Sequence, residues 1–428
     1  MIGNSKYSKK VNAWCMYDWA NSVYSLVITT AIFPIFYNSV TTSASGSDIV
    51  NFFGLEIVNS VLYSYSLSFS FLLLTIIQPI LSGIADYSGN KKFFLRIFMY
   101  LGSFSCMFLY FFEGSNIEFG IIFYVLASIG FTGSLVFYNA FLPEISTPDN
   151  FDKISARGYS FGYVGSVILL IICLILIQGF EFFGFENSKE ATKFTFLLVG
   201  IWWILFAQIT LHYLEEKPKK IILNKTILTY GAKELFKVWN YIKGVKNLKL
   251  YLLSYFFYSM GVQTIMLVAS YFGDKEINLD QNKLIFTILI IQLIAIFGAY
   301  FFAYVSRLRG NKFSLITMNI CWIIVCITAY YVTDETKFYT LAAAVGILMG
   351  GIQSLSRSTF SKLLPKEEGD TASFFNFYGI SYNISVVIGT FSYGYIEQVT
   401  GSMRSSVLAL TLFFILGLTF LIFTKIKK

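Results

Sequence analysis

Long apolar runs alternate with short polar segments along nearly the whole chain. Each run is about 20 residues or longer, which is the length that an α-helix needs to cross a membrane. The runs fall at about residues 13–39, 57–85, 93–112, 118–142, 158–180, 193–214, 248–272, 284–306, 313–333, 338–361, 372–397 and 403–424. The pattern predicts an all-α membrane protein with twelve transmembrane helices.

The longest polar segment divides these helices into two sets of six. It runs from Glu215 to Lys249 and is rich in lysine. We therefore expect an N-terminal six-helix bundle over residues 1–214, a basic cytoplasmic linker over 215–247 and a C-terminal six-helix bundle over 248–428. The linker reads either as an amphipathic segment that touches anionic lipid or as a solvated connection.

Short sequence matches relate the two sets at an almost constant spacing. The matches are Gly89–Lys91 with Gly310–Lys312, Leu142-Pro143 with Leu364-Pro365, and Gly158 and Ser160 with Gly379 and Ser381. Each match joins equivalent places in the two sets. Two parallel six-helix repeats follow, an arrangement in which transporters place a binding site between the halves.

Composition supports a membrane protein, and the charge sets its orientation. Of 428 residues, 56% are hydrophobic and 13% charged, against about a quarter charged in soluble proteins. With both termini cytoplasmic, 26 of the 32 lysines and arginines lie on the inner side, as the positive-inside rule requires. The net charge of +8 therefore reports topology in an inner or plasma membrane, and no nucleic-acid partner is expected.

Several chemistries are not supported by the sequence. All five cysteines fall within apolar runs, so no disulfide framework is expected. His212 is the single histidine, and no Gly-Lys dipeptide is present, which argues against zinc clusters and against a phosphate-binding Walker A loop. We expect no enzyme, no metal and no cofactor.

The segment Gly83–Lys92, at the inner end of the second run, carries the most specific motif. Gly83 allows close helix packing, Gly89 allows a tight turn, and Asp86 offers a carboxylate that can cap a helix or pair with a base. Lys91 and Lys92 hold the loop at the inner side. The plainer alternative is an ordinary basic hairpin loop.

This segment resembles the loop signature of the major facilitator superfamily. The resemblance implies that Gly83, Asp86, Gly89, Lys91 and Lys92 form a conformational latch between the halves and do not bind substrate. The second copy of the motif, Arg307–Lys312, has Arg307 where Asp86 stands. We therefore expect a latch in one half only.

Four further segments resemble a bacterial branch of that superfamily, the "unknown major facilitator" subfamily, which is related to the autophagy-linked vacuolar amino-acid effluxers of fungi. They are Tyr17–Ser22, Tyr138–Glu144, Arg157–Tyr163 and Gln353–Ser358. The resemblance implies a cargo similar to an amino acid.

The first run carries a polar stripe. Asp18, Asn21, Ser22, Ser25 and Thr29 fall within about 100° of arc on a helix. An ionisable group in a membrane span faces the protein interior or a water-filled cavity, because hydrocarbon disfavours its charge. Asp18 is thus either a coupling or substrate-ammonium site, or a gate and packing residue near the inner edge.

Other spans present polar faces that would meet this stripe. The candidates for substrate or coupling contact are Thr132, Tyr138 and Asn139, then Gln263, then Gln353 and Arg357, and finally Asn376 and Asn383. Arg357 would pair with Asp18 across the halves or with a substrate carboxylate. Alternatively, the Arg357 side chain extends so that its guanidinium group reaches the water at the inner surface.

The sequence thus predicts a secondary active transporter that moves a small metabolite, amino-acid-like by resemblance, by alternating access. Its expected partners are the cargo, a proton or cation, and membrane lipid, and it is expected to be a monomer. The alternative is a non-transporting receptor or scaffold on a transporter fold.

Overall fold

The computed structural model describes residues 2–42, 48–216, 226–365 and 370–426. Nearly all of them are helical, as the apolar runs predict. The one sheet among them is a two-stranded hairpin, β1 (Ile49–Phe52) paired antiparallel with β2 (Leu55–Val58). It lies in the connection after the first span.

The first six spans form the N-terminal half. Their helices are α1 (Ile2–Val23), the π-helix η1 (Tyr24–Ile32) and α2 (Phe33–Thr41), α3 (Asn59–Ser88), α4 (Lys91–Phe108) with the 3₁₀ turn η2 (Leu109–Phe111), α5 (Ile117–Ala140), α6 (Leu142–Ile145), the 3₁₀ turn η3 (Pro148–Asn150), α7 (Phe151–Gln178) and α8 (Ser188–Tyr213).

The remaining helices comprise one in the expected linker and seven in the C-terminal half. They are α9 (Thr226–Gly244), then α10 (Lys246–Ile277), α11 (Gln281–Arg309), α12 (Asn311–Tyr331), α13 (Glu335–Leu363), α14 (Thr371–Thr400), α15 (Met403–Ala409) and α16 (Thr411–Phe423). The last two helices together make one span.

Eleven of the spans in the described residues are long and apolar enough to cross a membrane by length and composition alone. The expected eleventh span, α14, is a 30-residue helix but is too polar to be among them. Asn376, Ser385 and Asn383 on this helix are buried inside the protein. α14 is therefore the twelfth of the expected helices, and it is less apolar than the others because some of its polar residues are buried inside the protein.

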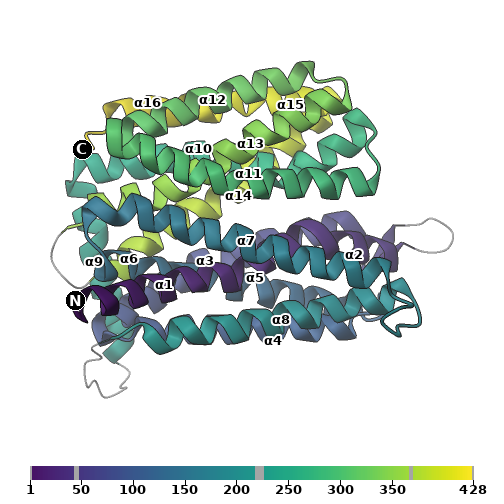
Figure 1. Ribbon diagram of the computed structural model, residues 1–428, viewed down its shortest axis with the longest axis horizontal. Helices are drawn as coiled ribbons and strands as arrows, with labels where there is room; N and C mark the ends of the chain where they lie inside the picture. The colour runs from purple at the N-terminus through teal and green to yellow at the C-terminus, as the bar shows by residue number, and fades with distance from the viewer. Residues whose placement is uncertain (1, 43–47, 217–225, 366–369, 427–428) are drawn as a thin grey trace.

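Figure 1 shows the two halves as two layers, with α1 to α8 in one layer and α10 to α16 in the other. Both chain ends lie at the same end of the bundle, beside α9. We call this the termini end. At the opposite end, Asn187, Asp280 and Asp334 cap the first turns of α8, α11 and α13 by accepting backbone N–H bonds.

A wide helical turn interrupts the first span where it lines the space between the halves. The helix α2 follows η1 directly and has Pro34 as its second residue. Proline has no N–H for the carbonyl four residues earlier, and its ring pushes that carbonyl away. The carbonyl left without this donor is that of Thr30, whose own hydroxyl donates to the carbonyl of Ser25, five residues back, at 2.8 Å. A proline inside a span favours a kink, but it does not predict a π-helix of nine residues.

Within the N-terminal half, α4 and α5 pack backbone against backbone through Gly102 and Gly130. A Cβ atom added to Gly130 would collide with the backbone of Gly102 and lie 2.8 Å from the carbonyl oxygen of Phe98. Gly394 on α14, in contrast, faces open space. Glycine is thus required at the first site for packing and is free to vary at the second.

Gly130→Val should destabilise the protein by about 1–3 kcal/mol, because overpacking forces the helices apart. Gly394→Val carries the same change in helix propensity without the collision, so its effect should be much smaller. Thermal unfolding of both variants in detergent, followed by size-exclusion chromatography, measures the difference. Equal losses in the two variants would show that the close approach of α4 and α5 does not matter.

Candidate functional site

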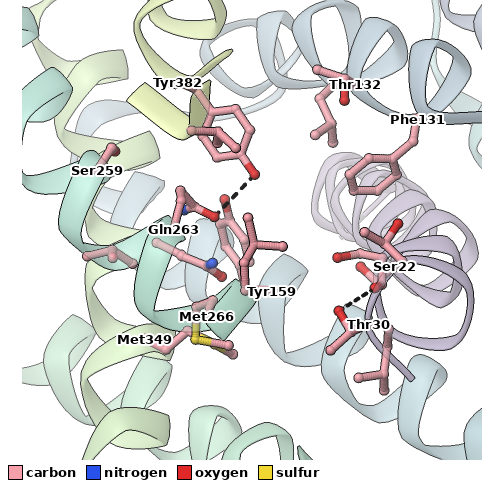
Figure 2. Close-up of a pocket in the computed structure, with 18 of the residues that line it drawn as sticks. Ser22, Thr30, Phe131, Thr132, Tyr159, Ser259, Gln263, Met266, Met349 and Tyr382 are labelled. Atoms are coloured by element: carbon pink, nitrogen blue, oxygen red, sulfur yellow. Dashed lines mark hydrogen bonds between the residues drawn. The ribbon is translucent and has the colours of Figure 1, made fainter. Parts of the chain in front are cut away.

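A cavity of about 240 Å³ lies between the two halves. Helices α1, η1, α3, α5 and α7 line one side, and α10, α11, α13 and α14 line the other. Figure 2 shows Ser22, Thr30, Phe131 and Thr132 on one side and Ser259, Gln263 and Tyr382 across from them. Among the described lining residues, the charged side chains are Asp18 and Arg357.

These two charges come from opposite halves and pair with each other. The Nη1 atom of Arg357 lies 3.1 Å from Oδ2 of Asp18, and the two side chains are 2% and 6% exposed. Tyr138 also donates its hydroxyl to the same carboxylate oxygen, at 2.8 Å. Removing either partner from a pair this deeply buried leaves an unpaired charge, which costs several kcal/mol.

Arg357 reaches from α13 into a socket made by the other half. Its Nε donates to Oγ of Ser155 and its Nη2 to the carbonyl of Ser155, both at 2.9 Å, while Nη1 also donates to Oδ1 of Asn139 at 3.3 Å. The guanidinium carbon lies 4.1 Å from the ring centre of Tyr159 and 4.6 Å from that of Trp14. We call Trp14, Asp18, Asn139, Ser155 and Tyr159 the Arg357 socket.

The socket depends on a glycine in α7. A Cβ atom on Gly158 would lie 2.5 Å from Oδ2 of Asp18 and 2.9 Å from Nη2 of Arg357. Gly162, one turn later, has Ser22 in the same position. The absence of side chains on this face of α7 lets α1 and Arg357 approach it.

Further hydrogen bonds join the two halves. Ser155 donates to the carbonyl of Ser354 at 2.7 Å, and the Tyr163 hydroxyl donates to Oε1 of Gln353 at 2.7 Å. Asp86, at the end of α3, accepts the backbone N–H groups of Ala372 and Ser373 at 3.1 and 2.6 Å. Its carboxylate therefore caps α14 of the opposite half, where the helix N-terminus favours negative charge.

A second latch occupies the equivalent place in the repeat. Asp152, in the first turn of α7, accepts from Ser306 at 2.9 Å and from Asn311 at 2.8 Å, and pairs with Lys362 at 2.7 Å. The sequence predicts such contacts from one copy of the motif only, whereas both motif regions contact the opposite half. Arg307 does replace Asp86. In this copy the carboxylate is that of Asp152 at the start of α7, and its donors lie on α11, α12 and α13, at or near the motif.

The other motif residues have separate tasks. Gly89 ends α3 in the left-handed conformation, at φ 68°. Lys91 joins Glu144 of its own half to Thr371 of the other. Lys92 does not reach the other half, since it donates to the carbonyl of Leu214 and, by its backbone, to the carboxylate of Glu216, whose pKa is raised by burial.

The family model for proteins described as "Vacuole effluxer Atg22 like" matches residues 6–428. The chain belongs to this Atg22-like family of major facilitator transporters. It is 32% identical to "Uncharacterized MFS-type transporter YxiO" of Bacillus subtilis, over 98% of this chain and 95% of that protein. It is 22% identical to "Autophagy-related protein 22-1" of Penicillium rubens, over 92% of this chain and 80% of that protein.

Solved structures of major facilitator transporters share its fold. FucP in the outward conformation matches with a TM-score of 0.71 and 12% identity, over 98% of this chain and 99% of that one. The proton:xylose symporter XylE matches with a TM-score of 0.70 and 11% identity, over 99% and 96%. The expected all-helical transporter fold is confirmed, and the chain is a transporter by family rather than an enzyme.

In this Atg22-like transporter, most residues predicted from the sequence to contact cargo do line the cavity. They are Asp18, Asn21, Ser22, Ser25, Thr132, Asn139, Gln263, Gln353, Arg357 and Asn383. Two others are not among the lining residues: Tyr138 is buried behind Asp18, and Asn376 is buried within the protein. Their helical positions are correct, but neighbouring side chains separate them from the cavity.

Two amide groups at the cavity wall, one from each half, are buried without hydrogen-bond partners in the described part of the chain. The side-chain oxygen and nitrogen of Asn21 and Asn383 are buried and have no hydrogen-bond partner among the described residues. Buried amides are normally paired. Both residues belong to the cavity wall, on α1 and α14, but their amide atoms are covered and do not open into the cavity.

Sequence reasoning missed the rest of the Arg357 socket. Trp14 lies one helical turn before Asp18, so helical spacing could have placed it on the same face. Ser155 is the repeat equivalent of Asn376, so the repeat could have pointed to it. Tyr159 lies in a segment chosen for resemblance alone. A cation–π contact with an arginine on a distant helix leaves no local pattern in the sequence.

Gly158→Ala should destabilise the protein by about 1–3 kcal/mol, since the added methyl group collides with the buried ion pair. The control is its repeat equivalent Gly379→Ala, whose methyl group would meet only Cγ2 of Val136, at 2.9 Å. Both substitutions gain similar helix propensity. Thermal unfolding should show a clear loss for Gly158→Ala and little for Gly379→Ala, and the reverse order would contradict the socket geometry.

Proposed function

We propose that this family member is a secondary active transporter that carries a net-neutral, amino-acid-like solute by alternating access. In this proposal residues 1–214 and 248–428 rock as two bodies about the cavity, and residues 215–247 link them. The bonds between the halves described above provide the contacts that must break and re-form.

We infer that the termini end is cytoplasmic, in an inner or plasma membrane, because that orientation places 26 of the 32 lysines and arginines on the inner side. The Asp86 and Asp152 latches and the Arg357 socket would then close the protein toward the cytoplasm. The match to FucP in the outward conformation supports this assignment of state.

The charge of the cavity lining supports a zwitterionic cargo. Its two charged groups, Asp18 and Arg357, neutralise each other while they are paired. When the halves separate, each group needs a new partner, because a lone buried charge is costly. A cargo with both an ammonium and a carboxylate group can supply both partners, whereas an ion of one sign leaves one charge unpaired.

The remaining lining suits the rest of such a molecule. The carboxamide of Gln263 offers polar contacts, and the stacked rings of Tyr255 and Tyr378, with centres 4.0 Å apart, offer an apolar surface. The resemblance to fungal vacuolar amino-acid effluxers agrees with a solute of this kind.

Asp18 is our candidate for the coupling site. Protonation of its carboxylate would remove the charge that Arg357 pairs with. The inner closure would weaken as a result, which links the uptake of a proton to the opening of the cytoplasmic side. Other groups in the Arg357 socket have no charge to lose in this way.

The test compares a neutral amino acid with its methyl ester and its N-acetyl derivative, each of which lacks one charge. The free amino acid should raise the melting temperature of the purified protein, and each derivative should bind at least about tenfold more weakly, the loss expected for one charged hydrogen bond. Asp18→Asn should remove the preference over the N-acetyl derivative, which lacks the ammonium charge, and Arg357→Gln should remove the preference over the methyl ester, which lacks the carboxylate.

Flux of the same amino acid into proteoliposomes, with and without a proton gradient, completes the test. Binding without flux would favour the receptor or scaffold alternative. Equal binding of all three compounds would contradict the zwitterion assignment, and flux that ignores the proton gradient in both the wild type and Asp18→Asn would contradict the coupling role.

A further inference from the structure

Helix α9, in the segment between the halves, contacts both of them at the termini end (Figure 1). Its Gly231 meets α3, where a Cβ atom on Gly83 would collide with the Gly231 carbonyl. A Cβ atom on Gly231 would lie 2.9 Å from Cγ1 of Ile84 and 3.1 Å from its backbone nitrogen. The two backbones thus touch, and glycine is needed on both helices.

The other end of α9 packs on α14 and on the residue before it. Lys237 pairs with Asp370 at 2.7 Å, a bond that raises the pKa of the lysine. The Trp239 ring stacks on Phe377, with ring centres 5.6 Å apart. Asp86 also joins α3 to α14. Helix α9 therefore bridges the same contact between the halves, on the outer surface of the bundle.

The depth of α9 follows from its contact with α3. Gly83 lies five residues before the end of that spanning helix at Ser88, which is about 7.5 Å along the axis. A helix that packs at this level lies beside the headgroup region of the membrane and not in bulk water.

The surface of α9 fits that location. Gly231, Val238 and Ile242 form the buried side, whereas the Phe236 and Trp239 rings are 66% and 40% exposed. The ammonium group of Lys243 lies 4.7 Å from the Trp239 ring centre. Exposed aromatic rings beside a lysine are typical of helices that lie in a membrane interface, where the lysine meets lipid phosphate.

We propose that α9 is a membrane-surface strap: Phe236 and Trp239 enter the interface, Lys243 binds anionic phospholipid headgroups, and the bound lipid holds α9 across α3 and α14 in the state closed at the termini end. The proposal requires α9 to lie at the leaflet beside the termini. It does not depend on which solute the cavity carries.

The first experiment places a nitroxide label at Phe236→Cys, in a cysteine-free background and in nanodiscs of phosphatidylcholine with or without one quarter phosphatidylglycerol. The label should collide more with oxygen than with a water-soluble nickel complex, and phosphatidylglycerol should strengthen that preference. The control label is Phe182→Cys, at an 88% exposed ring in the connection between α7 and α8, and it should not respond to phosphatidylglycerol. A water-exposed label at position 236 in both lipids would overturn the proposal.

The second experiment measures phosphatidylglycerol binding and the thermal stabilisation that it gives. Lys243→Gln should weaken binding about fivefold, the contribution of one lysine near an anionic surface. The control is Lys189→Gln, at an exposed lysine in the first turn of α8, and it should not weaken binding. Gly231→Val should abolish the stabilisation, and Gly244→Val, which faces open space on the same helix, should retain it. Inorganic phosphate should stabilise none of them.

Equal binding by all four variants, or equal stabilisation by inorganic phosphate, would refute the lipid strap. If a soluble protein bound without lipid and Phe236→Ser abolished that binding, this surface of α9 would be a protein-binding site and not a lipid-binding one. Amino-acid binding in the cavity is measured separately on the same variants, so failure of the transport proposal remains distinguishable.

Discussion

The contact between the halves is organised around one buried ion pair. Arg357 leaves its own half and finds its charged partner, most of its hydrogen-bond acceptors and the rings beside it in the other half. A guanidinium group buried in this way is stable only while the halves stay together, because it would otherwise lie unpaired in a medium of low dielectric. Opening the interface therefore requires a new partner for each of the two charges.

The surrounding residues adapt the helices to that pair. Gly158 removes the side chain that would separate Asp18 from Arg357. Closer to the termini end, two carboxylates join the halves. Asp86, at the end of α3, accepts hydrogen bonds from the start of α14, and Asp152, at the start of α7, accepts one from Asn311 at the start of α12. The repeat has kept the contact in both halves while exchanging the side that carries the negative charge.

Most of the fold follows from the sequence, whereas only part of the site does. Apolar length and the positions of lysine and arginine predict twelve helices and two halves, and helical periodicity brings Asp18, Asn21 and Ser22 to one face. Periodicity describes a single helix, so it cannot show that Tyr138 lies behind Asp18 or that Asp152 takes over the role of Asp86. Those arrangements depend on how helices distant in sequence pack, as does the π-helix before Pro34.

The account predicts that the Asp18–Arg357 pair holds the termini end closed, and the distance between the halves at that end tests this directly. Spin labels at Lys153→Cys and Lys249→Cys, both exposed and on opposite halves, report that distance in a background free of the five native cysteines. Arg357→Gln should add a population with a longer distance. Lys283→Gln, which breaks an ion pair within one half, should not. An unchanged distance distribution in Arg357→Gln would show that the pair does not hold the halves together.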